Sequence, residues 1–341
     1  MMQKWIAKFL GISLIAASFA AGWLLLDLQN FLHGPLTQDG AEIRYEVQPG
    51  AGLIAVARDL HRMGAMEHPY YLVWYARWRG GADRIKAGEY LVEPQMTPLQ
   101  LLDKLARGDV VRYTLTIPEG WTFSQMLAAV RAHEKVRHTL DTGDGQAVMQ
   151  QLGYPDQHPE GRFFPDTYLF PAGTTDVELL QYAYRAMERR LEEEWQGRAP
   201  GLPLETPYQA LILASIVEKE TGSPEERARI AGVFIRRLQR NMRLQTDPTV
   251  IYGLGAGFDG NLRRRDLAAD TPYNTYMRAG LPPTPIALPG GAALHAALHP
   301  APGDELFFVS RGDGTHHFSA SLMEHNDAVR DYQLNNGRGG K

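Results

Sequence analysis

Cysteine is absent from this chain of 341 residues. The chain therefore has no disulfide, no thiolate metal site and no cysteine nucleophile, and it offers no N-terminal cysteine for lipid attachment. Long basic tracts are absent as well, and 35 Lys and Arg against 39 Asp and Glu leave a formal net charge of -4. These features argue against nucleic-acid binding. The length and the apolar content of 44% are sufficient for two domains with real cores.

Long uncharged runs are also scarce, and the main one extends from Phe9 to Leu26. A helix of that length would reach roughly 27 Å, which is nearly the hydrocarbon thickness of a bilayer. Two lysines precede the run and a tryptophan lies near each end. We therefore predict a cytoplasmic segment at 1–8 and a transmembrane helix at 9–26, with the remainder outside. A cleaved signal peptide is the alternative, but the apolar run continues past its small residues, which favours a retained anchor.

Residues 27–42 are expected to form a short polar linker, and residues 43–112 a compact α+β unit. Its expected elements are a strand at 43–47, helices at 53–60 and 70–78, a strand at 85–92 and a helix at 98–106. A weaker copy of the order strand, turn and capped helix begins at Tyr113, which weakly indicates a duplicated binding module. Aromatic residues are dense in this part of the chain, namely Tyr70, Tyr71, Trp74, Tyr75, Trp78 and Trp121. Their rings could stack on sugars, but a place in the core is favoured.

The most informative stretch is residues 206–222. Thr206 can cap a helix, a proline follows at the first helical position, and Gly222 is expected to close the helix in a left-handed turn. The residues between are apolar almost all round, so this helix should be buried on most sides. Its last turn carries Glu218 and Glu220.

A buried carboxyl group at that place is poorly solvated, and the helix dipole also disfavours its negative charge. Both effects raise the pKa, so the group keeps its proton near neutrality, as a general acid for glycosidic cleavage must. Residues two apart do not share a helix face, and the small neighbours Ala214 and Ser215 leave room for a substrate beside Glu218. The alternative is a structural glutamate paired with one of the arginines that follow.

After this helix, Ser223–Glu226 is predicted to be a capping box that opens another helix, whose arginines are assigned to solvated surface. The chain then becomes rich in long loops, where prolines fix the backbone and polar side chains can hold a sugar. The alternative role of these loops is structural. The predicted substrate contacts there are Gln245, Thr246, Asp247, Tyr273 and Asn274.

Four residues near the C-terminus invite a metal interpretation, namely His316, His317, Glu324 and His325. No H-E-x-x-H spacing is present, and adjacent histidines on a strand point to opposite faces. We therefore predict no metal site and no cofactor. Residues 335–341 form a glycine-rich basic tail that is expected to be disordered.

Several blocks together resemble the MltG (YceG-like) family of endolytic murein transglycosylases. They occur in the expected order and span nearly the whole chain. The blocks are Val47–Gly50, Phe163–Tyr168, Ala214–Thr221, Gln245–Gly253, Pro272–Tyr276, Gly280–Ile286 and Glu324–Asn326. Two positions depart from the family pattern. Thr246 stands where many relatives carry serine, and Leu288 stands where the familiar sequence has asparagine.

The resemblance implies an α+β protein of the inner membrane. It implies an N-terminal transmembrane helix, a LysM-like module at 43–112 and a mixed α/β catalytic domain at 113–334 with long ordered loops. The catalytic domain would lie in the periplasm and act on peptidoglycan glycan strands beside the membrane's peptidoglycan synthases. The family's essential glutamate falls on Glu218.

The expected reaction is non-hydrolytic cleavage of the β-1,4 bond between N-acetylmuramic acid and N-acetylglucosamine. Glu218 would be the acid and then the base, and the muramic C6 hydroxyl would close a 1,6-anhydro ring. No second enzymatic carboxylate is required, unlike in ordinary glycosidases. Glu220 would then be a supporting, substrate-binding residue. Three alternatives stay open: a hydrolytic muramidase that uses Asp247 or Glu220, a non-catalytic glycan-binding anchor for synthases, and a metal-dependent amidase.

Overall fold

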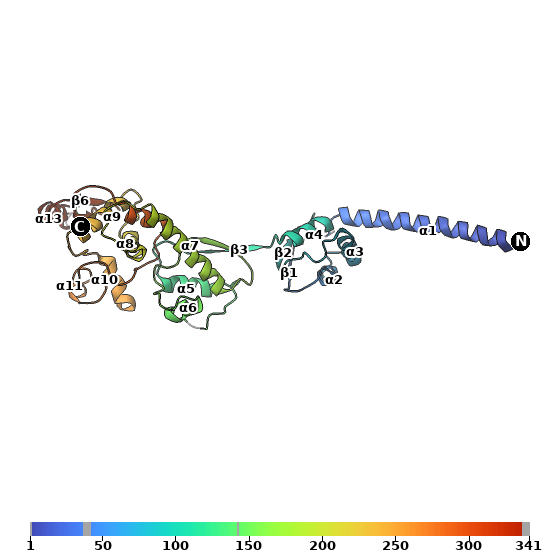
Figure 1. Cartoon of the computed structure of the whole chain (residues 1–341), viewed down its shortest axis with the longest axis horizontal. Coiled ribbons are helices and arrows are strands. Elements are labelled where there is room, and N and C mark those ends of the chain that lie inside the picture. Colours follow the sequence, from blue (N-terminus) through green and yellow to red (C-terminus); the bar gives the residue numbers. More distant parts are fainter. Residues whose placement is uncertain (1, 37–41, 142, 336–341) are drawn as a thin grey trace. The chain divides into compact units, whose positions relative to one another are not determined.

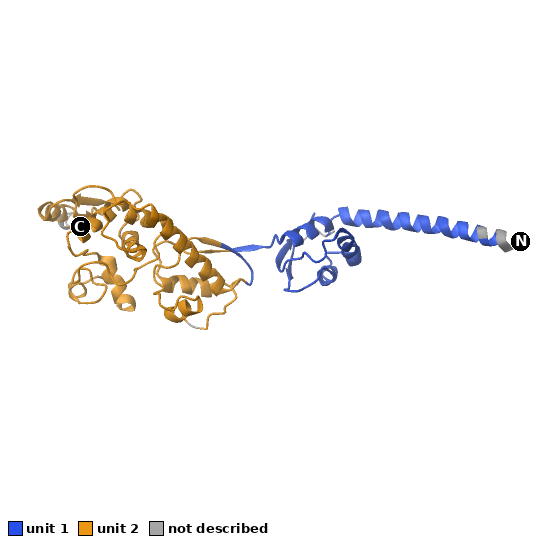
Figure 2. Cartoon of the chain, in the orientation of Figure 1, with its two compact units in different colours: residues 1–113, 169–173 blue, residues 114–168, 174–341 orange. Residues whose placement is uncertain are grey.

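The computed structural model describes residues 2–36, 42–141 and 143–335, and the chain divides into two compact units. Unit 1 comprises residues 1–113 and 169–173, and unit 2 comprises residues 114–168 and 174–341 (Figure 2). The predicted domain boundary after residue 112 lies one residue from this division. The segment 169–173 groups with unit 1, although it lies within the stretch predicted to be the catalytic domain. Most of the predicted tail, residues 336–341, lies outside the described residues.

The N-terminal helix α1 spans Met2–His33 without a break (Figure 1). Within it, Lys8–His33 is long and apolar enough to cross a membrane, with a mean hydropathy of 2.1, and its apolar window is not buried. The predicted linker at 27–42 is therefore wrong in its first part, because helix continues to His33. Tertiary contacts explain the difference, since Leu32 and Leu36 are buried against the rest of unit 1. Residues 37–41 of the predicted linker lie outside the described part of the chain.

Unit 1 also contains a strand–helix–helix–strand module. Strand β1 pairs antiparallel with β2 in the register Ile43↔Val92 to Val47↔Gly88. The apolar period predicted for the first helix is confirmed, because Leu53, Val56, Ala57 and Leu60 are all buried. The elements are β1 Ile43–Val47, α2 Leu53–Arg62, α3 Pro69–Arg79, β2 Gly88–Val92 and α4 Pro98–Arg107.

Three aromatic side chains of α3 are not in the core. Tyr70, Trp74 and Trp78 are 55%, 56% and 85% exposed, so their predicted place in the core is wrong. They recur at every fourth residue, and the face that α3 buries carries Leu72, Val73 and Ala76 instead.

Strands β3 Arg112–Thr116 and β4 Thr167–Pro171 form a two-stranded sheet, and both strands cross the division between the units. In unit 2, β3 leads to α5, which begins after a capping box formed by Thr122 and Gln125. The predicted order of strand, turn and capped helix is thus present in this second copy, but in the first copy α2 begins after Gly52 without a side-chain cap, so that copy departs from the prediction. The helices that follow are α5 Phe123–Ala132, α6 Gly145–Gln151 and α7 Asp176–Gln196.

The core of unit 2 surrounds α8, whose residues from Ala210 to Val217 are buried without exception. Side chains of α7, α9 and α12 belong to the same apolar cluster. The remaining elements are α8 Pro207–Glu220, α9 Arg227–Gln239, α10 Asp247–Leu254, η1 Gly255–Gly257, α11 Arg264–Ala268, α12 Gly291–Leu298, β5 Phe307–Ser310, β6 His316–Ser319, α13 Leu322–Val329 and η2 Arg330–Asn335. The last two strands pair as an antiparallel hairpin.

Two predicted helix ends are wrong. The residue that caps the C-terminus of α8 is Thr221 in extended backbone, and Gly222 does not adopt a left-handed conformation. Helix α9 begins at Arg227 after a turn, and its N-cap Glu226 makes no capping hydrogen bond, so Ser223–Glu226 is not a capping box. Glu226 instead binds the backbone N–H and the ring of His316.

Candidate active site

Helix α8 begins as the sequence predicts, with the Thr206 side chain accepting the N–H of Gln209. Near its end, the Ser215 hydroxyl donates to the Ile212 carbonyl and accepts the N–H of Ile286. The second bond fixes the proline-rich loop against the helix one turn before Glu218. The burial of α8 and this bond together place Glu218 firmly beside the loop that ends at Gly290.

Glu218 is half-buried, and its Oε2 accepts the backbone N–H of Gly290 at 3.0 Å. A side chain at Gly290 would displace Glu119, because a Cβ at this position would lie 1.7 Å from Oε1 of Glu119. On the other side, a Cβ at Gly120 would lie 3.9 Å from Cγ of Glu218. Two close backbone approaches, from residues distant in the sequence, thus enclose the carboxyl group.

Burial raises the pKa of the Glu218 carboxyl above its usual value, as the sequence predicted. The Gly290 N–H acts in the opposite direction because it stabilises the carboxylate, while the nearby charge of Glu119 raises the pKa further. Arg227 and Lys219 lower it again. Burial of Glu218 therefore favours the neutral acid, while the Gly290 N–H stabilises the carboxylate once the proton is lost.

A cleft of about 1290 Å³ opens next to this group. The cleft is lined by α5, by α10 and by Lys219. The loops that precede α6 and Gly161 also contribute to the lining. Glu218 is not itself in the lining. Gly120 and Lys219 are, and Gly120 lies against the side chains of both Glu218 and Lys219. Glu218 thus lies at the edge of a space large enough for several sugar rings.

A second desolvated carboxyl group in this cleft was missed by the sequence analysis. Glu160 is only 4% exposed, and it lines the cleft. Its Oε1 accepts the N–H of Phe123 at 2.9 Å, and its Oε2 accepts the Tyr252 hydroxyl at 3.1 Å. Glu160 thereby joins the N-terminus of α5 to α10. The sequence pattern around Glu160 gives no sign of either partner, because both lie in distant segments.

Burial also raises the pKa of Glu160, to about 7 from an ordinary value of 4.5. The folded state therefore binds this proton more tightly than the unfolded state does, so the free energy of unfolding must fall as pH rises between these values. The full contribution is roughly 3 kcal/mol, because one pKa unit corresponds to about 1.4 kcal/mol. This contribution of Glu160 to the free energy of unfolding is fully present below pH 4.5 and is lost as pH rises through 7.

We expect Glu160→Gln to flatten this pH dependence. The amide keeps an acceptor for the Phe123 N–H but does not ionise, so the variant should lose less stability than the parent between pH 5 and pH 8 (roughly, from the pKa of about 7). Urea unfolding across that range measures the difference. Glu225→Gln, at an exposed position, is the control. Parallel pH profiles for the parent and Glu160→Gln would contradict the assignment.

Glu220 lies in a different environment from Glu218, as their spacing predicted. Its Oε1 accepts the hydroxyl of Thr246, and burial of the carboxyl raises its pKa to about 7. Part of the residue still reaches solvent, but the charged atoms are enclosed. Asp247 raises this pKa, whereas His316 and Arg237 lower it. The structure therefore brings together Glu220, Thr246 and Asp247, three of the predicted substrate-binding residues.

The other predicted contacts differ in exposure. Asp247 and Gln245 are exposed, although Asp247 also accepts the hydroxyl of Tyr276. Tyr273 is half-buried, and its hydroxyl lies 2.8 Å from that of Thr284. Asn274 is 1% exposed. Its side-chain amide donates to three backbone carbonyls, and its oxygen accepts a backbone N–H, so its polar atoms hold the loop in shape.

Leu288, the position that departs from the family pattern, has a structural role. Its N–H donates to the Trp121 carbonyl and its carbonyl accepts the Gly120 N–H. The side chain is fully buried. These two backbone bonds hold the turn at Gly120 beside the loop that carries Gly290, and they do not depend on the identity of the side chain.

Among the described residues, one group could offer three metal ligands within 4.8 Å of one another: Glu194 of α7, His295 of α12 and His299, which follows the end of α12. Arg190 already lies 2.7 Å from Glu194, and His295 lies 2.9 Å from it. The two imidazole rings stack 4.2 Å apart with planes 18° from parallel, so their in-plane nitrogen lone pairs do not converge on one point. We interpret this group as an ion-pair cluster that joins α7 to α12.

The four residues considered for a metal from the sequence do not converge in the part of the chain that the structure describes. His316 pairs with Glu226, and the ring of His325 stacks on Phe307. Glu324 caps the N-terminus of α13. Each of the three has its own structural partner.

Comparison with known proteins gives a consistent result. The sequence model described as the YceG-like family matches residues 45–331. A protein of Bacillus subtilis (strain 168) named endolytic murein transglycosylase is 30% identical over 337 residues, covering 94% of this chain and 91% of the relative. A protein of the same name from Streptococcus pneumoniae serotype 2 is 29% identical over 320 residues, covering 84% of this chain and 57% of the relative. The crystal structure of a YceG-like protein from Listeria monocytogenes is 30% identical with a TM-score of 0.54, covering 85% of this chain and 99% of that one.

Proposed function

This chain belongs to the YceG-like family, and we propose that it is a lytic transglycosylase that cleaves peptidoglycan glycan strands. The bond cleaved is the β-1,4 bond between N-acetylmuramic acid and N-acetylglucosamine, within nascent strands, and cleavage terminates their elongation. The observation that carries the proposal is the desolvated Glu218 carboxyl at the edge of a cleft of about 1290 Å³. The names of the relatives support the same activity.

The Gly290 N–H fixes which oxygen of Glu218 acts. Because Oε2 accepts this bond, we assign the proton to Oε1, which would then give it to the glycosidic oxygen. Transfer of the proton breaks the bond between C1 of the muramic ring and that oxygen, as positive charge develops on the ring. The carboxylate left behind is stabilised by the Gly290 N–H. It then takes the proton of the muramic C6 hydroxyl, whose oxygen bonds to C1 and closes the 1,6-anhydro ring.

This sequence of steps needs one enzymatic carboxyl group, because the substrate provides the nucleophile. Glu220 is assigned a supporting role, since its carboxyl is held by Thr246 on a different face of α8. Gln245, Asp247 and Tyr273 remain the proposed sugar contacts, with Thr246 and Glu220 behind them. Asn274 contributes through the shape of its loop, because its polar atoms are already bonded.

Membrane anchorage places the enzyme near its substrate. We assign α1 as a single-pass inner-membrane anchor with a cytoplasmic N-terminus and the catalytic unit in the periplasm, near peptidoglycan synthases. Support comes from the apolar window of α1 and from the lysines that precede it. The α+β module of unit 1 is assigned as a LysM-like glycan-binding module.

The mass of the products tests the proposed reaction. Digestion of purified sacculi with the detergent-solubilised full chain should release fragments whose muramic ends are lighter by one water than hydrolytic ends. Hydrolytic ends would instead support a muramidase in which Asp247 or Glu220 positions water. Binding of sacculi without any cleavage would support a non-catalytic anchor. Chelator treatment provides a control, since loss of activity would favour a metal-dependent amidase.

A further inference from the structure

One face of α3 is aromatic and exposed, and the rings of Trp74 and Trp78 there contact only tyrosines of α3 itself among the ring contacts of the described residues. We call it the α3 aromatic face, and it consists of Tyr70, Trp74, Arg77 and Trp78. All four residues are exposed. At 3.6 residues per turn they fall within about one third of the helix circumference, opposite the buried side chains of α3. Large exposed aromatic groups of this kind usually mark a surface that meets another phase or partner.

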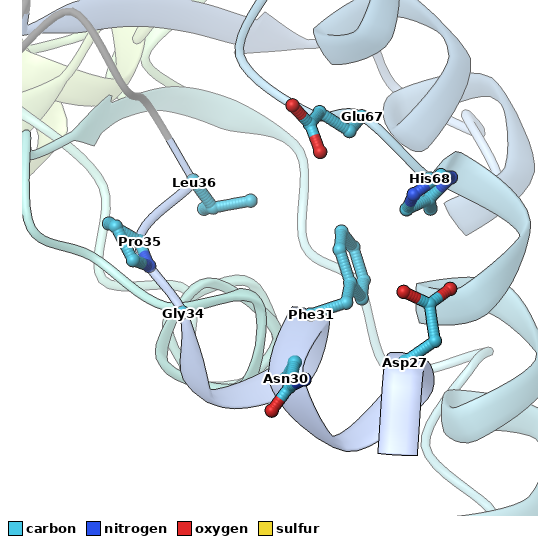
Figure 3. A pocket seen from close by; sticks show the side chains of 8 residues that line it. All are labelled: Asp27, Asn30, Phe31, Gly34, Pro35, Leu36, Glu67 and His68. Carbon is cyan, nitrogen blue, oxygen red and sulfur yellow. The ribbon is translucent and has the colours of Figure 1, made fainter. Parts of the chain in front are cut away.

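Helix α3 is fixed to the end of the apolar part of α1. The Tyr71 hydroxyl donates to Oδ2 of Asp27 at 2.8 Å. The ring of Phe31 packs edge-on against Tyr71, with ring centres 5.7 Å apart, and against His68 at 5.9 Å. Figure 3 shows Phe31 between Leu36 and His68, with Asp27 beside it, in a pocket of about 240 Å³. The start of α3 and the end of α1 therefore move as one body.

Asp27 indicates where the hydrocarbon layer ends along α1. It is the first charged residue after Lys8, so hydrocarbon cannot extend far beyond it if α1 spans a bilayer. Tyr71 lies at this depth because it binds Asp27, and the ring of Trp74 is centred 6.0 Å from that of Tyr71. The headgroup layer is several Å thick on each side of the hydrocarbon, and it is where Trp and Tyr are enriched in membrane proteins. Trp74 falls in or next to this layer.

We propose that the α3 aromatic face lies in the outer headgroup layer of the same bilayer that α1 crosses. This inference rests on the proposed membrane anchorage. The polar neighbours of the rings on α3 are Arg77 and Arg79, which suit lipid phosphates. Helix α3 has no amide or carboxylate side chain of the kind that binds sugar hydroxyls. The α3 aromatic face therefore contacts the lipid headgroups. The membrane anchor then consists of the α1 helix and this second contact at the membrane surface.

The absence of native cysteine permits a direct depth measurement in the full chain. Single spin labels are placed by Arg77→Cys, which leaves all three aromatic rings in place, by Leu25→Cys in the apolar run, and by Glu193→Cys on an exposed position of α7. The chain is reconstituted into vesicles of phosphatidylethanolamine and phosphatidylglycerol. The ratio of collision rates with oxygen and with a water-soluble nickel chelate then reports the depth of each label.

We expect the highest ratio at Leu25→Cys and an intermediate ratio at Arg77→Cys, several-fold above that at Glu193→Cys. Adding Trp74→Ala and Trp78→Ala should reduce the ratio at Arg77→Cys towards that at Glu193→Cys. These variants should still fold, because both tryptophans are exposed and surface substitutions cost little stability. Equal ratios at Arg77→Cys and Glu193→Cys, with Leu25→Cys in lipid, overturn the proposal. If added peptidoglycan fragments then immobilise the Arg77→Cys label, the face binds glycan instead. A Leu25→Cys label found in water would show that α1 does not span the bilayer, and this would overturn the anchorage and the proposal together.

Discussion

Glu218→Gln should cleave purified glycan about 10²- to 10⁴-fold more slowly than the parent chain, which is the range that general acid catalysis contributes. The amide cannot give a proton to the glycosidic oxygen or take one from the C6 hydroxyl. Its oxygen can still accept the Gly290 N–H, so the fold and the neighbouring loop should persist. The measurement is the rate at which anhydro ends are released from sacculi, together with the thermal midpoint of each protein.

A matched control for this experiment is Glu225→Gln, an exposed glutamate in the turn before α9. It makes the same chemical change a short distance along the chain and should cleave at the parent rate. If Glu218→Gln also cleaved at the parent rate, Glu218 would not be the acid. A large loss of thermal stability in Glu218→Gln would leave the rate uninterpretable, so Glu218→Asp provides a second variant, which keeps an acid but shortens its reach.

The raised pKa of Glu218 predicts how kcat/KM of the parent enzyme changes with pH. The reactive form of the free enzyme is the protonated acid, so kcat/KM should fall as pH rises through that pKa. Burial and the charge of Glu119 move this fall to higher pH, and Arg227 moves it to lower pH. Arg227→Met should therefore shift the fall upward, provided that the change leaves the fold intact.

Much of helix α8 could be predicted because its signals are local. The cap at Thr206, the buried run and the separation of Glu218 from Glu220 depend on residues within one or two turns, and the structure confirms them. Gly222 shows the limit of such signals. A glycine after a helix permits a left-handed cap, but Thr221 already leaves the helix in extended backbone, so that conformation is not needed.

The surroundings of Glu218 could not be predicted, because they come from distant segments. The Gly290 N–H is 72 residues away, and Glu119 is farther still along the chain. Glu160 illustrates the same limit, since Phe123 and Tyr252 reach it from two different helices. Residue type alone does not separate these glutamates from solvated ones. Arg237 was assigned to solvated surface for the same reason, and the structure shows that this assignment is wrong.

Arg237→Met should destabilise unit 2 by about 3–5 kcal/mol, the usual cost of breaking a buried charged network. Arg237 is 7% exposed, and its Nε donates to the Leu306 carbonyl at 2.6 Å. Its Nη1 donates to the carbonyls of Leu244 and Arg243 and to Oε1 of Gln245. Methionine fills a similar volume but leaves the buried carbonyls of Leu306 and Leu244 without this donor, and each such loss costs about 1–3 kcal/mol.

The effect of Arg237→Met should reach the active site, because the lost bonds hold the segment that leads into Thr246 and Asp247. The positive charge of Arg237 lowers the pKa of Glu220 in the parent protein. Removing that charge should therefore raise the pKa of Glu220 in the variant. Calorimetry should show a fall of about 10 °C in the thermal midpoint, since 1 kcal/mol corresponds to about 2–4 °C at this size. Arg240→Met, exposed on the turn that follows α9, should change the midpoint very little. Equal midpoints for the two variants would mean that water replaces the guanidinium at these carbonyls, and the Arg237 network would then not be what fixes the loop carrying the proposed sugar contacts.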